Sequence, residues 1–269
     1  MPLGRVAPLG RDEGPRLAPS REALKCIIRL SVRRLDFWPQ SRYPCPWQGP
    51  LHPREAQSKR WQESPLRNHF FLAIEGPIGV GKTTLARLAH RDLGGELLLE
   101  VFEENPFLSR FYQDRARYAF QTQLFFLLSR YRQQRSVVPA TLARTSLVSD
   151  YTFAKDRLFA HLNLAQDELE MYERVHYILA ENIPTPTLVV YLRADTDVLM
   201  QRIAHRDRPY ERGMSRAYIE EVRQAYERFF GREYREAPVL TIDTDDLDIV
   251  RREEDLQAVL GRIRAALEE

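Results

Sequence analysis

Residues 69–93 read HFFLAIEGPIGVGKTTLARLAHRDL, and this stretch decides the fold. The apolar run over 69–75 predicts a buried strand, and the pattern TTLARLAHRDL predicts a helix that Gly94 and Gly95 end. A glycine-rich loop joins the two elements. The order of strand, glycine loop and helix is typical of phosphate-binding loops in α/β proteins.

This loop matches the pattern GxxxxGK[ST] in full. In that pattern the backbone N–H groups converge on phosphate oxygens, the lysine reaches the β- and γ-phosphates, and the hydroxyl faces Mg²⁺. We therefore expect the chain to bind a nucleoside triphosphate with Mg²⁺. The residues expected to bind it are Gly76, Pro77, Ile78, Gly79, Val80, Gly81, Lys82, Thr83 and Thr84.

Four further short apolar runs follow, at 96–100, 146–149, 187–193 and 239–242, with longer helical patterns between them. Short apolar strands that alternate with helices predict a parallel sheet buried on both faces. We therefore expect an α/β fold with a five-stranded parallel sheet flanked by helices. Ligands of such sheets bind beyond the carboxyl ends of the strands, so the residues after each run form the candidate site.

The net charge of the 269-residue chain is +2, but its two parts differ. Residues 1–67 hold 13 Lys and Arg against 6 Asp and Glu, with ten of the 17 prolines, all three tryptophans and both cysteines. The other 202 residues are mildly acidic and contain no cysteine, which excludes a disulfide framework or a cysteine nucleophile there. Because no apolar run is long enough to cross a bilayer, we expect no membrane-spanning segment.

We expect residues 1–67 to be an extension that is disordered or not part of the native protein, and residues 68–269 to form the functional domain. The many prolines of the extension break regular structure. Two other interpretations stay open: an Arg-rich targeting peptide, against which the acidic residues count, and a basic arm for acidic partners. Since every motif lies in the acidic part, the basic extension does not indicate nucleic-acid binding.

Several enzyme classes share the phosphate loop. The GTPase pattern DxxG fits Asp92–Gly95, but this segment ends the first predicted helix instead of following a later strand, and no NKxD motif comes after it. We therefore interpret it as the end of a helix.

A carboxylate follows the second predicted strand. Glu100 is expected to point into the same crevice as the phosphate loop, where it could take a proton from a hydroxyl acceptor. The alternative is that Glu100, Glu103 and Glu104 form a solvated acidic turn before a helix that Pro106 begins. Position alone leaves both interpretations open.

Five motifs follow one another in order: FLAIEGPIGVGKTTLARLA, ExxEENPFL, FYxxxxxYAFQTQLFFLLSRYRQ, VSDYTFAKDRLFA and QRIAHRDRPYE. Together they resemble the bacterial deoxynucleoside kinase family, in particular its deoxyguanosine and deoxyadenosine kinase branch, over residues 69–265. The resemblance implies a P-loop kinase fold that phosphorylates the 5′-hydroxyl of a deoxyribonucleoside with ATP. It slightly favours purine deoxynucleosides.

The resemblance assigns the acceptor side of the site. Glu100 matches the general base for the 5′-hydroxyl, and Tyr112 with Glu211 matches the pair that binds the 3′-hydroxyl. Gln123 and Arg130 match the residues that read the base edge; seven residues apart on a helix, they share one face.

Asp156 matches the carboxylate that pairs with this arginine and faces the base. A buried glutamine on a largely apolar helix is costly unless it is paired, which favours a binding role for Gln123. Two alternatives stay open: Gln121, the nearest glutamine in register, could read the base instead, or Gln123 could be a polar helix residue with no binding role.

The resemblance also assigns the phosphate side. Thr83 and Asp150 match the residues that hold Mg²⁺, and residues 243–248 resemble the loop on the donor adenine. The expected catalytic cations are Lys82 and three lid arginines, Arg202, Arg206 and Arg208. Guanidinium groups stay charged and can bind phosphate oxygens in two-pronged fashion, although a solvated basic helix end would look the same.

One departure stands out. The wider family has an arginine directly after the acidic residue at position 150, whereas this chain has Tyr151. The branch that the chain resembles also carries Asp-Tyr there, so we expect activity to be kept. The sequence does not show which residue supplies the missing positive charge. Arg144 is near in sequence, but its position relative to the site cannot be inferred.

The sequence leaves two rival functions. A nucleoside monophosphate kinase of the thymidylate kinase type shares the loop, but the acidic run 103–104 would repel an acceptor phosphate. A non-catalytic assembly subunit would be expected to lose the loop lysine. We therefore expect a cytoplasmic nucleotide-salvage kinase whose partners are ATP and a deoxyribonucleoside; the resemblance implies a homodimer.

Overall fold

A computed structural model of the chain describes residues 69–102, 104–181 and 183–268, so the expectations for residues 1–67 lie outside the described residues. The elements, in chain order, are β1 (Phe71–Glu75), α2 (Lys82–Leu93), β2 (Glu96–Leu98), α3 (Leu108–Gln113), α4 (Arg115–Leu142), β3 (Leu147–Ser149), α5 (Lys155–Asn163), α6 (Gln166–Ala180), β4 (Leu188–Arg193), α7 (Thr196–Arg206), α8 (Arg216–Arg228), the π-helix η1 (Phe229–Glu233), β5 (Val239–Asp243) and α9 (Glu253–Glu268).

The five strands form one parallel sheet in the order β2-β3-β1-β4-β5. This confirms the α/β fold and all five predicted strands. The central strands β1 and β3 are buried along their whole length, as the continuous apolar runs require for a sheet covered on both faces. The strand order reverses at β1, with β3 on one side and β4 on the other, and the phosphate loop leaves β1 at this switch point.

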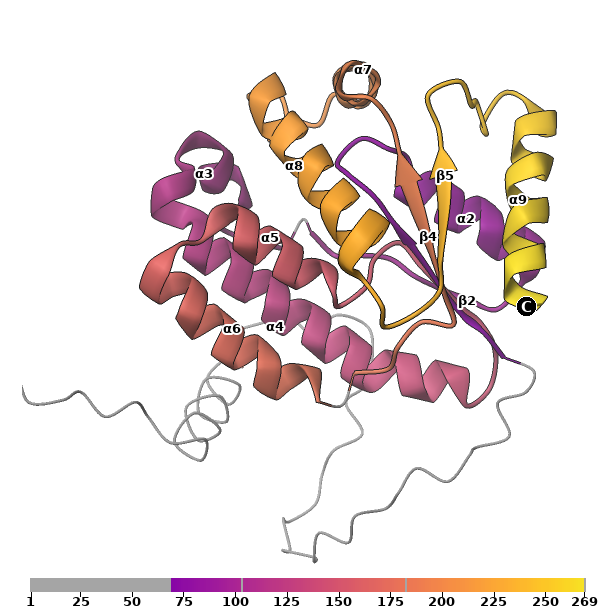
Figure 1. Cartoon of the computed structure of the whole chain (residues 1–269), viewed down its shortest axis with the longest axis horizontal. Helices are drawn as coiled ribbons and strands as arrows, with labels where there is room; N and C mark the ends of the chain where they lie inside the picture. Colours follow the sequence, from indigo (N-terminus) through magenta and orange to yellow (C-terminus); the bar gives the residue numbers. More distant parts are fainter. Residues whose placement is uncertain (1–68, 103, 182, 269) are drawn as a thin grey trace, which may run out of the picture. The chain divides into compact units, whose positions relative to one another are not determined.

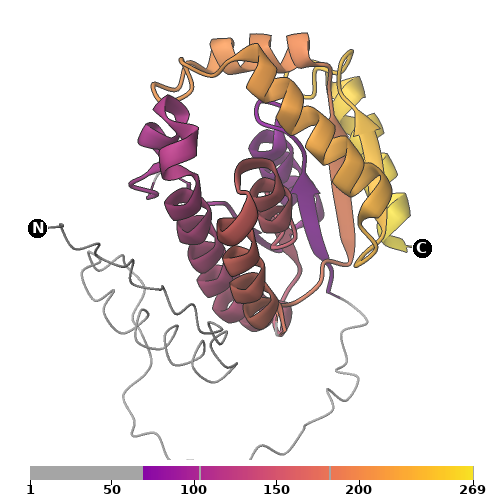
Figure 2. The same cartoon turned by 60° about the vertical axis from the view of Figure 1, so that its left-hand side comes forward.

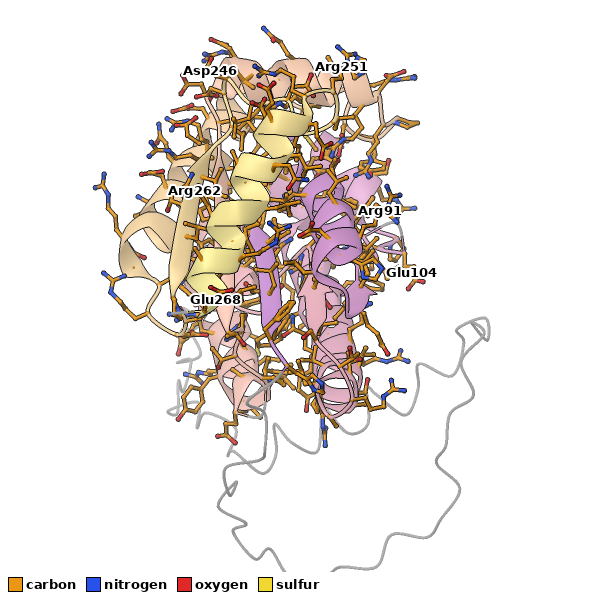
Figure 3. The ribbon with its side chains drawn as sticks, turned by 90° about the vertical axis from the view of Figure 1, so that its right-hand side faces the viewer. Arg91, Glu104, Asp246, Arg251, Arg262 and Glu268 are labelled. Carbon is orange, nitrogen blue, oxygen red and sulfur yellow. The ribbon has the colours of Figure 1, made fainter. Side chains whose placement is uncertain are left out.

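Helices cover both faces of the sheet (Figure 1). Helices α2 and α9 lie on one face, and α4, α5, α6 and α8 lie toward the other (Figures 1 and 2). Charged side chains such as Arg91, Arg262 and Glu268 cover the outer side of α2 and α9 (Figure 3). An ion pair links these two helices, because Arg264 Nη2 lies 2.5 Å and 2.6 Å from the two carboxylate oxygens of Asp92.

Helix α4 is the longest element, with 28 residues. The Asp114 side chain caps its start by accepting a hydrogen bond from the backbone N–H of Arg117 at 3.2 Å. The buried face of α4 carries polar residues as well as apolar ones, including Thr122, Gln123 and Arg130. Buried polar groups need partners, so this face is a candidate ligand surface and not only a packing surface. Within the described residues, no helix has the length and apolarity needed to cross a membrane.

The phosphate loop packs closely on the neighbouring strand. Gly76, which directly follows β1, has φ +149°, a conformation that residues with a side chain rarely adopt. A Cβ atom at Gly76 would lie 2.4 Å from the backbone oxygen of Leu192 in β4. Glycine is therefore required here for steric reasons, in addition to the approach of phosphate.

We expect Gly76→Ala to lower the free energy of unfolding by about 2 kcal/mol or more, because it adds both strain and a clash with backbone. Gly261→Ala is the matched control: Gly261 lies in α9 with open space around its Cα. This variant should gain about 0.5–1 kcal/mol, since alanine favours a helix over glycine. Urea unfolding of both full-length variants measures the difference. Equal stability of Gly76→Ala and the wild type would contradict the steric argument.

Candidate active site

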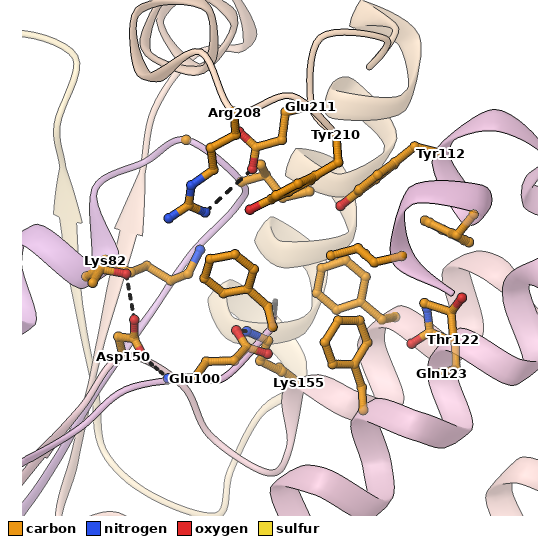
Figure 4. A pocket seen from close by; sticks show the side chains of 18 of the residues that line it. Lys82, Glu100, Tyr112, Thr122, Gln123, Asp150, Lys155, Arg208, Tyr210 and Glu211 are labelled. Atoms are coloured by element: carbon orange, nitrogen blue, oxygen red, sulfur yellow. Dashed lines mark hydrogen bonds and ion pairs between the residues drawn. The ribbon is translucent and has the colours of Figure 1, made fainter. Parts of the chain in front are cut away.

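A cavity lies beyond the carboxyl ends of β1, β2 and β3, where the sequence places the site (Figure 4). Its walls come from the phosphate loop, α3, α4, α5, α8 and the segment after α7. Most of the predicted site residues line it: Ile78, Gly79, Lys82, Thr83, Glu100, Tyr112, Gln123, Arg130, Asp150, Arg206, Arg208 and Glu211. The structure thus brings the phosphate loop and the predicted acceptor residues to one place.

Lys82 lies at the phosphate end of the cavity. Its ammonium donates hydrogen bonds to the backbone oxygens of Gly76 at 2.7 Å and Pro77 at 3.0 Å. Burial, and after it the charge of Lys155, lower the pKa of Lys82 to about 8. Because α2 begins at this lysine, its first N–H groups also face the loop, which favours an anion here.

Thr83 and Asp150 meet beside the loop. The hydroxyl of Thr83 donates to Oδ2 of Asp150 at 2.6 Å, and Oδ1 of Asp150 accepts from the backbone N–H of Glu100 at 2.8 Å. Hydroxyl and carboxylate oxygens are the ligands that Mg²⁺ prefers. Within the described residues, no cluster of three or more His, Cys, Asp or Glu could hold a metal. An ion held by Thr83 and Asp150 would take its remaining ligands from phosphates and water.

Glu100 lies at the centre of a cluster of buried charges. Its Oε1 accepts from Nε of Arg130 at 2.9 Å and also from Nη2, and its Oε2 accepts from Nζ of Lys155 at 2.8 Å. Arg130 binds Oδ1 of Asp156 through Nη1. Burial acts to raise the pKa of Glu100, but the two cations prevail and hold this pKa well below its usual range. The carboxylate is therefore ionised.

The acidic-turn interpretation does not describe Glu100. Its side chain is 15% exposed and bonded to two cations, whereas Glu104, four residues on, is exposed. The two carboxylates of this turn thus have different surroundings, and only Glu100 lines the cavity.

The far end of the cavity has buried polar atoms that lack partners. Oε1 of Gln123 and Oγ1 of Thr122, both on lining residues, have no hydrogen-bond partner among the described residues. The same holds for Oδ2 of Asp156, which does not itself line the cavity but is bonded through Oδ1 to the lining residue Arg130. Burial raises the pKa of Asp156, and the Arg130 guanidinium opposes that rise. Because leaving such atoms unpaired is costly, a ligand with several hydrogen-bonding groups is expected here. Gln121, the alternative in register, is exposed.

An aromatic and acidic wall closes one side (Figure 4). The rings of Tyr112 and Tyr210 stack with centroids 6.4 Å apart and planes at 11°. Glu211 is buried beside them and accepts from Nε of Arg206 at 3.0 Å and from Nη2 at 2.6 Å and 2.7 Å. Arg208 lies 3.7 Å from Glu211 and stacks its guanidinium over the ring of Phe102 at 4.4 Å.

The three predicted lid arginines do not lie together. Arg206 and Arg208 line the cavity, but Arg202 is not among the lining residues. Its guanidinium donates to the backbone oxygen of Thr244 at 2.6 Å and to the Thr244 hydroxyl at 2.9 Å. Its Nη1 also donates to the backbone oxygen of Val80 in the phosphate loop at 3.4 Å, so Arg202 joins α7 to the loop after β5 and to the phosphate loop. Arg144 does not line the cavity either: it is exposed and pairs with Glu96 at 3.0 Å.

Two functional candidates were missed in the sequence. Lys155 directly precedes Asp156 in the motif VSDYTFAKDRLFA, and a single lysine at the start of a helix does not indicate burial.

Glu75 is the second candidate; it ends the apolar run of β1 and is fully buried. It accepts from the backbone N–H and hydroxyl of Thr152 at 2.6 Å and 3.0 Å, and from the Tyr226 hydroxyl at 3.2 Å. Its position, as a carboxylate at the end of an apolar strand, is the feature of the sequence that could have indicated a functional residue.

This parallel α/β sheet, with a phosphate loop that faces a charged acceptor cavity, defines a P-loop phosphotransferase. The comparisons with known proteins make the class specific. The family model "Deoxynucleoside kinase" matches residues 72–268. The chain belongs to the deoxynucleoside kinase family.

Relatives of known name support the match. Deoxyguanosine kinase of Bacillus subtilis is 33% identical over 198 residues, which cover 72% of this chain and 96% of the relative. Deoxyadenosine/deoxycytidine kinase of the same organism is 26% identical, covering 77% of this chain and 97% of the relative. The structure of deoxyadenosine kinase from M. mycoides with bound dATP matches with a TM-score of 0.64 and 25% identity, over 73% of this chain and all of that one.

The lowered pKa of Lys82 predicts a pH dependence of ATP binding. The phosphates favour the ammonium form, which is the major form below pH about 8 and is lost above it. With EDTA present to remove metal effects, the ATP dissociation constant should be flat from pH 7 to about 8 and then rise up to about tenfold per pH unit. Isothermal titration calorimetry measures it.

Lys82→Arg is the control, since a guanidinium stays charged throughout this range. Its ATP affinity should not change between pH 7 and about 9.5. A wild-type affinity that is equally flat over this range would contradict the lowered pKa.

Proposed function

We propose that the chain transfers the γ-phosphate of ATP, with Mg²⁺, to the 5′-hydroxyl of a purine deoxyribonucleoside. The observation that carries the proposal is that one cavity holds both the phosphate loop and Glu100. Asp150 links them directly, because its two oxygens bind the Thr83 hydroxyl and the Glu100 backbone. A hydroxyl bonded to Glu100 would therefore lie next to the γ-phosphate.

On the acceptor side, the base would enter the far end of the cavity and pair with Oε1 of Gln123 and Oδ2 of Asp156, two buried oxygens that have no partner among the described residues. Tyr112 and Glu211 would bind the 3′-hydroxyl. The 5′-hydroxyl would then donate to the Glu100 carboxylate, which is ionised and so can accept the bond and orient an oxygen lone pair toward phosphorus.

On the donor side, residues 76–84 would hold the phosphates through backbone N–H groups and Lys82. Thr83 and Asp150 would hold Mg²⁺, which when bound neutralises charge on the phosphate oxygens. Phosphoryl transfer needs mainly positioning and electrostatic stabilisation, and Lys82, Arg206 and Arg208 would supply positive charge. Arg202 would act from the donor side, by holding α7 against the loop after β5.

The two rivals are not favoured. The acceptor phosphate of a nucleoside monophosphate kinase would need a cationic pocket, whereas Arg130 and Lys155 are both bonded to Glu100. A non-catalytic subunit would not need the complete phosphate loop or a buried cluster of charges that costs desolvation energy.

The purine preference is supported by relatives named deoxyguanosine kinase, although one relative is named deoxyadenosine/deoxycytidine kinase. We further propose that residues 68–269 make up the catalytic domain. The resemblance of the sequence supports a homodimer that acts in nucleotide salvage in the cytoplasm.

A coupled assay of ADP formation tests the substrate class. We expect activity with deoxyguanosine or deoxyadenosine at least about tenfold above that with deoxycytidine or thymidine, measured as kcat/KM, because an unpaired site polar group costs about that much. Thymidylate should give no activity. Activity with thymidylate alone would favour the nucleoside monophosphate kinase, and activity with none of these acceptors would contradict the proposal.

Glu100→Gln tests the acceptor mechanism. The amide keeps the size of the side chain but removes the negative charge, so we expect kcat to fall by about 10² to 10⁴, while ATP affinity changes little. Glu104→Gln is the matched control in the same turn, because Glu104 is exposed, and it should keep wild-type kcat. Steady-state kinetics and ATP titration measure both variants. Near wild-type turnover of Glu100→Gln would refute the role of Glu100.

A further inference from the structure

We propose that Lys155 is a positioning residue for phosphoryl transfer, which orients Glu100 and supplies the positive charge that the residue after Asp150 does not provide. The inference rests on the proposed function, because it concerns how the acceptor hydroxyl is oriented. Nothing in the sequence around Lys155 indicates a role for it in the site. The contacts of its ammonium carry the argument.

Lys155 is held in the cavity by its position at the start of α5. It is 4% exposed, and its ammonium lies 2.8 Å from Oε2 of Glu100. The other carboxylate oxygen, Oε1, accepts from Arg130. Two cations on two helices thus bind the two oxygens separately, which fixes the plane of the carboxylate and not only its position.

The two cations differ in what else they bind. Arg130 is also bonded to Asp156, so its guanidinium is shared between two carboxylates. The ammonium of Lys155 has three protons, and its bond to Glu100 uses one of them. Lys155 also lines the cavity together with Lys82, and its charge acts on the pKa of Lys82. Lys155 therefore contacts the acceptor carboxylate directly and is near enough to the phosphate-binding lysine for its charge to act there.

Tyr151 cannot take this role. It occupies the position after Asp150, and its hydroxyl donates to Oε1 of Gln133 on α4 at 2.7 Å. Burial raises the pKa of this tyrosine further, so it carries no charge. Arg144 pairs with Glu96 on the surface. Lys155, the first residue of α5, binds the Glu100 carboxylate, so a chain with Asp-Tyr at 150–151 still has a positive charge beside Glu100.

A buried lysine with a single carboxylate partner could instead serve only to neutralise charge during folding. The two roles differ in their effect on kinetics. A positioning residue acts on kcat through Glu100, so its removal should matter only while the Glu100 carboxylate is present. A merely structural residue affects stability and leaves the kcat of the folded protein unchanged.

The test compares full-length variants with deoxyguanosine or deoxyadenosine, whichever the wild type uses faster, as acceptor. Lys155→Met, which keeps the length of the side chain, should lower kcat by about 10² to 10³ and change the KM for ATP by less than about threefold. Lys155→Arg keeps the charge with altered geometry, and its kcat should lie about three- to thirtyfold below the wild type at an unchanged Tm. Arg157→Met, which removes an exposed cation of the same helix, is the control and should match the wild type.

A double-mutant cycle separates the explanations. In the Glu100→Gln background, Lys155→Met should lower kcat by less than about threefold, because the partner is already lost. An equal loss in both backgrounds, or wild-type kcat in Lys155→Met, would overturn the inference. If Lys155→Met alone does not fold, the double variant restores the charge balance, and a kcat about tenfold or more below that of Glu100→Gln overturns it. Wild-type kcat in a stable Lys155→Arg, together with an unfolded Lys155→Met, would show a structural role only.

Failure of the proposed function can be told apart from failure of the inference. A wild-type chain that phosphorylates no deoxynucleoside refutes both. An active wild type together with wild-type kcat in Lys155→Met refutes only the inference.

Discussion

The interaction of Arg130 with two carboxylates holds the acceptor half of the site together. Glu100 follows β2, Arg130 lies in the middle of α4, and Asp156 lies in the first turn of α5. None of the three could stay buried and charged alone, because the desolvation cost is repaid only by close pairing. The sheet and the two helices are therefore linked through charge as well as through apolar packing.

Asp150 makes the corresponding link on the donor side. It follows β3, and through its two oxygens it connects the first turn of α2 with the backbone of Glu100. The carboxyl ends of neighbouring parallel strands lie at one edge of the sheet, so residues far apart in the chain meet there. The two halves of the site are thus fixed relative to each other by the sheet edge and by one carboxylate.

The sequence predicted the sheet well, since strands buried on both faces give continuous apolar runs. The predicted strand over 96–100 ends at Leu98, because the N–H of Glu100 binds a side chain instead of a neighbouring strand. Most site residues came from motifs. Two contacts could not be predicted from the sequence. Lys155 binds Glu100, which lies 55 positions earlier in the chain. Arg202 binds Thr244, although it belongs to the same sequence motif as Arg206 and Arg208, which line the cavity.

The pairing of Glu211 with Arg206 has a consequence for drug-like substrates. Both carboxylate oxygens of Glu211 accept from this arginine. On the proposed binding mode, a sugar 3′-hydroxyl would add a bond to one of these oxygens while Arg206 stays paired, since a carboxylate can accept about four hydrogen bonds. Chain-terminating nucleoside analogues, which lack that hydroxyl, would bury the carboxylate without this added bond, so the enzyme would discriminate against them through lost hydrogen bonding rather than by excluding them from the cavity.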